Sequence, residues 1–133
     1  MRHLVPAIAL ILGATAPAAA APGDMTVGDF LEKAAVLKAR GMLAVLSSDY
    51  RLLKTEAAGA WRTYSARLAA ERAEGRSSSC PPRSVKVDTG VVLEYLQTYP
   101  AAERGRIDLH QAVADYSRRT WPCRAPQLAR YPR

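Results

Sequence analysis

The sequence predicts an all-α fold, a small four-helix-type bundle stapled by one disulfide bond. Apolar residues recur at helical spacing in four stretches, whereas the alternation typical of strands appears only over residues 84–88. The chain has 133 residues, which suits one domain, and its two cysteines suit one bridge. We expect a helical domain over residues 21–123, a leader over residues 1–20 and a loosely ordered tail over residues 124–133.

The leader has the layout of a secretory signal peptide. A cationic start precedes the apolar run Leu4–Leu12, a break with glycine and proline follows, and then come small residues. We expect cleavage between Ala20 and Ala21. A retained membrane anchor is the alternative, but nine apolar residues span only about half of the ~30 Å hydrocarbon core. Cleavage leaves a periplasmic product of 113 residues with no membrane association, and the loss of Arg2 lowers the net charge from +7 to +6.

The first helix is expected over residues 26–40. Thr26 begins it, with Asp29 three residues on as a shortened capping-box partner. The apolar stripe of this helix consists of Val27, Phe30, Leu31, Ala34 and Leu37. Gly41 is placed to end the helix in a left-handed conformation, and a short apolar turn, Met42–Leu46, follows.

The second helix, over about residues 49–74, is the longest. One apolar arc runs along it and consists of Tyr50, Leu53, Ala57, Ala60, Trp61, Tyr64 and Leu68. Gly59 lies in the middle of the helix and indicates either a kink or close packing. The following stretch Gly75–Arg83 is rich in glycine, serine and proline and is expected to be a loop.

Two shorter helices complete the predicted bundle. Asp88 or Thr89 begins the third, and Pro100 ends it because the residue before a proline is disfavoured in the helical region. Asp108, with Gln111 as its capping partner, begins the fourth. The fourth helix is expected to end at Trp121-Pro122-Cys123.

Cys80 and Cys123 are expected to form a structural disulfide because an exported chain meets an oxidising compartment. The bridge closes about 43 residues, which the chain-entropy model values at roughly 4 kcal/mol. The alternative is a catalytic thiol activated by His110, which remains the only histidine after cleavage. The simpler interpretation of His110 is a surface residue near the start of a helix.

No enzyme class finds support in the remaining motifs. The sequence holds no nucleotide-binding glycine loop, HExxH or GxSxG, and it predicts no catalytic, cofactor-binding or metal-binding residues. A hydrolase would need paired acids across a cleft. The scattered candidates, which also suit helix caps and solvated faces, are Glu71, Glu74, Glu94, Glu103, Asp108 and Asp115.

The positive charge has two interpretations. Fifteen arginines against four lysines suit an acidic protein partner or an anionic envelope polymer. A compositional bias of the source genome explains the same excess. The arginines form no dense stripe, and an exported protein is not expected to bind nucleic acid.

The second half of the chain resembles the Tai/Rap-type immunity proteins, which protect bacteria against type VI secreted amidase effectors. The residues that carry the resemblance are Cys80-Pro81-Pro82, Val91–Leu96, Tyr99-Pro100, Ala112-Val113, Tyr116 and Trp121-Pro122-Cys123, with a fainter match at Val27–Leu31. The resemblance implies a non-enzymatic periplasmic inhibitor of a peptidoglycan amidase, all-α and compatible with a homodimer. It identifies no interface residues.

A second resemblance supports a different function. Periplasmic acid-stress chaperones of the HdeA type are also small, exported, helical and bridged by one disulfide, and their opening is similar to Asp29-Phe30-Leu31. This alternative implies a protein that loosens near pH 2–3, as its carboxylates become protonated.

Overall fold

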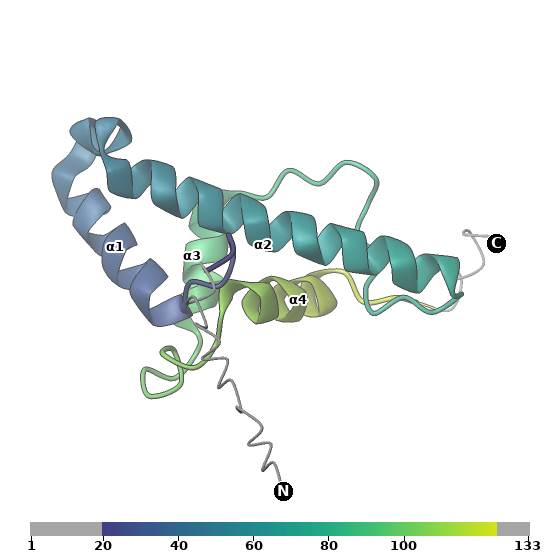
Figure 1. Ribbon diagram of the computed structural model, residues 1–133. Coiled ribbons are helices and arrows are strands. Elements are labelled where there is room, and N and C mark those ends of the chain that lie inside the picture. Colours follow the sequence, from purple (N-terminus) through teal and green to yellow (C-terminus); the bar gives the residue numbers. More distant parts are fainter. Residues whose placement is uncertain (1–19, 125–133) are drawn as a thin grey trace, which may run out of the picture.

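Four α-helices and one 3-10 helix make up the described part of the chain, residues 20–124 of the computed structural model (Figure 1). They are α1 (Val27–Arg40), the 3-10 helix η1 (Gly41–Leu46), α2 (Ser48–Ala73), α3 (Thr89–Gln97) and α4 (Leu109–Thr120). These residues contain no strand, so the predicted all-α class is confirmed. The expected leader, apart from its last residue, and the tail beyond Arg124 lie outside the described residues.

Helices α1, α3 and α4 begin at capping residues that the sequence predicts. The hydroxyl of Thr26 accepts a hydrogen bond from the amide of Asp29, and the carboxylate of Asp108 accepts one from Gln111. Asp88 caps α3 in the same way, and Ser47 caps α2. These side chains satisfy amides that have no partner inside their own helix, which explains why the helices start there.

Helix α2 is the longest element, and two others pack on it. Figure 1 shows α1 and α2 as an open hairpin joined by η1, with α4 running beside the second half of α2. Helix α3 packs against α1. None of the helices among residues 20–124 is both long and apolar enough to cross a membrane.

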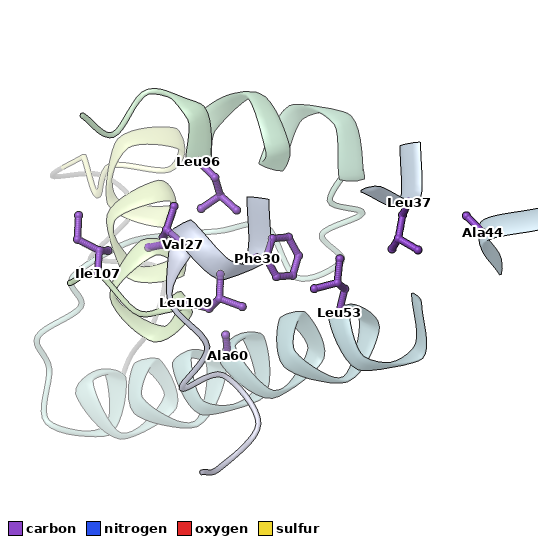
Figure 2. Close-up of a cluster of buried hydrophobic side chains, with 10 residues drawn as sticks. Val27, Phe30, Leu37, Ala44, Leu53, Ala60, Leu96, Ile107 and Leu109 are labelled. Atoms are coloured by element: carbon purple, nitrogen blue, oxygen red, sulfur yellow. The ribbon is translucent and has the colours of Figure 1, made fainter. Parts of the chain in front are cut away.

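The core lies where the first turns of α1 and α4 meet α2 and α3. Figure 2 shows Phe30 and Val27 of α1 among Leu96 of α3, Leu109 of α4 and Leu53 of α2. All five of these side chains are buried. A second, smaller cluster joins α2 to α4 through Tyr64, Leu68 and Ala114. The arcs predicted for α1 and α2 therefore supply the core, although Tyr50 and Ala57 of the α2 arc are exposed.

The first turns of α1 and α4 are tied together by backbone hydrogen bonds. The amide of Val27 donates to the carbonyl of Ile107 at 2.8 Å, and the amide of Leu109 donates to that of Met25 at 3.0 Å. This exchange forms an isolated antiparallel bridge between Thr26 and Asp108, the two capping residues. Both helices therefore start from one shared point.

Residues 20–26 form a strap that crosses α2 before α1 begins (Figure 1). The strap meets α2 at Gly59, where an added Cβ would overlap the carbonyl group of Pro22. Gly23 has a φ of 109°, and a Cβ there would overlap the imidazole of His110. Of the two interpretations of Gly59, close packing is therefore the one that the structure supports.

The carboxylate of Glu56 holds the strap in place. Its Oε2 accepts hydrogen bonds from the amide of Gly23 at 2.7 Å and from that of Met25 at 3.2 Å. Glu56 lies on α2, more than thirty residues further along the chain. Hydrogen bonds to a charged acceptor are stronger than neutral ones, so one side chain fixes the path of the whole strap.

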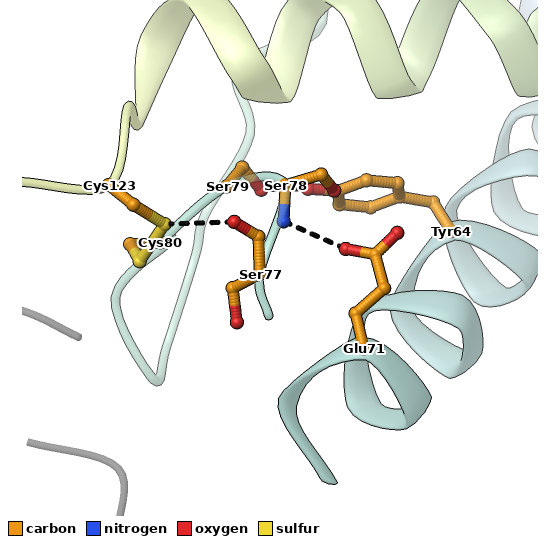
Figure 3. The surroundings of a disulfide bond; sticks show 7 residues. All are labelled: Tyr64, Glu71, Ser77, Ser78, Ser79, Cys80 and Cys123. Carbon is orange, nitrogen blue, oxygen red and sulfur yellow. Dashed lines mark hydrogen bonds between the residues drawn. A yellow bond between two sulfur atoms is a disulfide. The ribbon is translucent and has the colours of Figure 1, made fainter. Parts of the chain in front are cut away.

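The predicted disulfide between Cys80 and Cys123 is present (Figure 3). The amide of Cys80 donates to the carbonyl of Trp121 at 2.8 Å, so the two segments are also paired through their backbones. Nearby, the hydroxyls of Tyr64 and Ser79 form a buried hydrogen bond between α2 and the loop. The bridge therefore pins the loop after α2 to the end of α4.

Substitution of Gly59 by alanine should destabilise the protein. Alanine is the better helix former by about 1 kcal/mol, but overpacking typically costs about 1–3 kcal/mol, and here the obstacle is backbone. Thermal unfolding should show a lower Tm for G59A. G105A is the matched control, because a Cβ at Gly105 meets nothing within 4 Å. An unchanged or higher Tm for G59A would contradict the close approach of Pro22 to Gly59.

Removal of the disulfide should cost roughly 4 kcal/mol, the chain-entropy value for a loop of 43 residues. Denaturant unfolding of the oxidised protein and of the double variant C80S/C123S measures this difference. Intact-mass analysis after alkylation without a reductant should find no labelled thiol in the native protein. Labelling of both cysteines would show that the bridge is absent from the native protein.

Candidate functional site

The structure accounts for the residues that the sequence analysis considered for chemistry. Cys80 and Cys123 are bonded to each other, so neither sulfur is available as the nucleophile of the catalytic-thiol hypothesis. No group of three or more histidine, cysteine, aspartate or glutamate side chains suited to a metal ion occurs among residues 20–124.

His110 is not the simple surface residue that the sequence suggests. Its imidazole packs against Gly23 of the strap, and its Nε2 lies 3.5 Å from Oδ1 of Asp24. The side chain is about a quarter exposed. The sequence does not predict this contact, because Gly23 and Asp24 are far from His110 along the chain and come close to it only in the folded protein. His110 therefore helps to hold the strap in place.

The six scattered acids are not brought together into a cleft. Asp108 caps α4, and Asp115 accepts a hydrogen bond from the hydroxyl of Tyr99 at 3.0 Å. Glu74 pairs with Arg76, while Glu94 and Glu103 are exposed. Each of these six acids thus has a structural or solvated position.

The surroundings of Glu71 perturb its carboxyl group. Its Oε2 accepts a hydrogen bond from the amide of Ser78 at 2.8 Å, which ties the end of α2 to the loop before the disulfide (Figure 3). Hydrogen bonding from Ser78, with the nearby guanidiniums of Arg67 and Arg76, lowers the pKa of Glu71 against the opposing effect of burial. The ionised carboxylate therefore stabilises the folded state.

The strongest candidate for a functional surface is the turn between α1 and α2. Four of its apolar side chains project into solvent: Met42, Leu43 and Leu46 are 93, 74 and 77% exposed, and Val45 is more than half exposed. We call these four residues the apolar tip. Figure 1 places η1 at the end of the molecule away from the end of α4. Exposed apolar clusters of this kind commonly mark interaction sites.

The 3-10 geometry of η1 explains why so many apolar side chains point outward. Ala44 alone turns inward and is buried, where it joins the core beside Leu37 and Leu53. The carbonyl of Ala44 accepts hydrogen bonds from both the amide and the hydroxyl of Ser47, which fixes the turn into α2. One anchor therefore holds the turn, and its remaining apolar side chains have no partner within residues 20–124 that buries them.

Basic residues flank the apolar tip along the chain on both sides. Lys38 and Arg40 lie in the last turn of α1, and Arg51 and Lys54 lie near the start of α2. All four are exposed. The one acid in this stretch, Asp49, already pairs with Lys33 at 3.4 Å. An apolar centre with flanking basic residues suits a partner that offers an apolar cleft with acidic edges.

The sequence does not by itself identify the tip as a surface. Met42–Leu46 is a short apolar turn, and an apolar run is ordinarily assigned to the interior. Its position along the chain is the feature that could have indicated exposure. Gly41, which ends α1, precedes it, and Ser47, which caps α2, follows it. Five apolar residues between two such signals are too few to form a buried helix of their own.

Comparisons with protein-family models, with curated proteins and with solved structures find no match to this chain. The assignment of a function therefore depends on the geometry above and on the sequence resemblance.

Replacement of Glu71 by glutamine should make the stability of the protein less dependent on pH in the acidic range. The pKa of Glu71 is lower in the folded state than its ordinary value of 4.5, so its stabilising effect is complete at neutral pH and is lost as the pH falls through the folded-state pKa. The Tm of E71Q should therefore lie below that of the wild type at pH 7, and this deficit should be smaller at pH 3, below the ordinary pKa of 4.5.

The control for this measurement is E94Q, because Glu94 is exposed on α3. Its Tm should follow that of the wild type at both pH values. A deficit of E71Q that is equally large at pH 7 and at pH 3 would show that the ionised carboxylate is not what stabilises the fold.

Proposed function

We propose that this chain is an exported, non-enzymatic binding protein that engages a protein partner through its apolar tip. The exposure of Met42, Leu43, Val45 and Leu46 is the observation that carries the proposal. A soluble domain gains nothing in stability from four unburied apolar side chains on one turn, whereas a binding surface requires an apolar centre.

The partner we propose is a peptidoglycan amidase effector of a type VI secretion system, which the protein inhibits as an immunity protein. The resemblance to the Tai/Rap-type family supplies this partner. The all-α fold and the Cys80–Cys123 bridge are compatible with that family, and the basic residues around the tip would speed the approach of an acidic partner surface. Insertion of the tip into the substrate cleft would exclude peptidoglycan.

Export to the periplasm is the second component of the proposal. The signal-peptide pattern predicts a chain that starts at Ala21, whose nitrogen lies 2.7 Å from Oδ2 of Asp24. In a cleaved chain this nitrogen is an ammonium group, which would form an ion pair with the Asp24 carboxylate. The proposed cut thus falls where the new terminus gains a charged partner on the strap, and an oxidising compartment would suit the disulfide.

Replacement of Leu43 and Leu46 by aspartate should abolish binding. The double change places two charges at the centre of the apolar tip, and desolvation of unpaired charges opposes association. Isothermal titration with candidate periplasmic amidase effectors should show a loss of at least about a hundredfold in affinity, equivalent to about 2.7 kcal/mol. Co-expression should no longer rescue cells from lysis by the effector.

The matched control is A66D/A69D, which places the same charges on exposed positions of α2. It should bind and protect as the wild type does. Full protection by the tip variant would refute the tip as the interface. Failure of the wild type to bind any amidase, with capture of unfolded clients near pH 2–3, would favour the acid-stress chaperone. Dimers that disappear in the tip variant would assign the tip to self-association.

A further inference from the structure

A cavity of about 370 Å³ lies between α2, α3 and α4, apart from the apolar tip. Helix α2 contributes Ala57, Ala58 and Trp61, helix α4 contributes Tyr116 among others, and Phe30 of α1 also reaches it. The cavity is partly open to solvent. Its volume lies at the lower end of the range of about 300–1,000 Å³ that is typical of sites for small organic molecules.

The segment before α3 covers part of this cavity. Val85 and Val87 line it and are half-buried, whereas Ser84, Lys86 and Asp88 between and beside them are exposed. This is the same stretch in which the sequence shows its only strand-like alternation. Because the segment pairs with no sheet, the alternation has another use here: one side of an extended segment faces the cavity and the other faces water.

The lining of the cavity is almost entirely apolar. No charged side chain lines it, and the lining side chains that carry a polar atom are those of Thr89, Trp61, Tyr95 and Tyr116. The hydroxyl of Tyr95 lies 3.3 Å from that of Tyr99 and so already has a partner. Water needs two to four polar partners to occupy a cavity stably, and a charged ligand group would be desolvated without compensation.

We propose that this cavity binds the hydrocarbon chain of a small amphiphile, such as a fatty acid or a monoacylglycerol. The apolar lining selects the chain, and the opening to solvent leaves the polar head in water. Val85 and Val87 close over the chain, while Lys86 between them remains in solvent. This site shares no residue with the apolar tip, so it does not depend on the proposed function.

The experiment uses fluorescence quenching in the mature chain. Trp61 lines the cavity, and the ring of Trp121 lies 6.2 Å from that of Trp61, so both tryptophans report on its contents. Dodecanoate with a terminal bromine, kept below its micelle concentration, should quench this fluorescence in a saturable way. Affinity should fall by about tenfold for every two methylenes removed from the chain. Unbrominated dodecanoate and monododecanoylglycerol should displace the probe equally well, because neither head enters the cavity.

Variants locate the site. A58F fills the mouth of the cavity from an exposed position. It should lower the affinity for the probe by at least about tenfold. A66F, the same change on α2 outside the cavity, should leave binding unchanged, and circular dichroism checks that both variants are folded. The tip variant L43D/L46D should also bind normally. Absence of quenching, affinity independent of chain length, equal binding by A58F, or loss of binding in the tip variant would each overturn the proposal.

Discussion

The crossing of the strap over α2 determines how the other helices are placed. At this point two backbones approach so closely that Gly59 cannot carry a side chain, and the neighbouring carboxylate of Glu56 holds the strap by two amides. The strap leads directly into the first turn of α1, which exchanges hydrogen bonds with the first turn of α4. The crossing thereby sets the starting points of both helices relative to α2.

The disulfide has the complementary role at the far end of α2. Between the crossing and the bridge, α4 packs along α2 through the smaller cluster of Tyr64, Leu68 and Ala114. A domain of this size has only a modest core, and covalent closure of one end supplements it. Neither of these two restraints includes η1, which is held by the buried side chain of Ala44 and by the hydrogen bonds from Ser47 to the Ala44 carbonyl. The turn that exposes the apolar tip therefore lies outside both the crossing and the bridge.

Local patterns were sufficient to predict the helices, because Thr26, Ser47, Asp88 and Asp108 cap them by contacts only two or three residues away. The disulfide followed from cysteine number. The strap could not be predicted in the same way, since its partners Glu56 and His110 lie far along the chain. The cavity and the exposure of the apolar tip could not be predicted from the sequence either. Periodicity identifies an apolar residue but not whether a neighbouring element covers it. Val87 is half-buried at the cavity, whereas Leu43 is exposed.

The exposed side chains of η1 have a practical consequence for handling the purified protein. At high concentration, contacts between the tips of separate molecules are the natural route to aggregation, and repulsion among Lys38, Arg40, Arg51 and Lys54 opposes them. Added salt screens this repulsion over about 10 Å at 0.1 M while leaving the apolar attraction intact. Colloidal stability should therefore be best in dilute buffers of low ionic strength, and crystals grown from concentrated salt should bury the tip in a lattice contact.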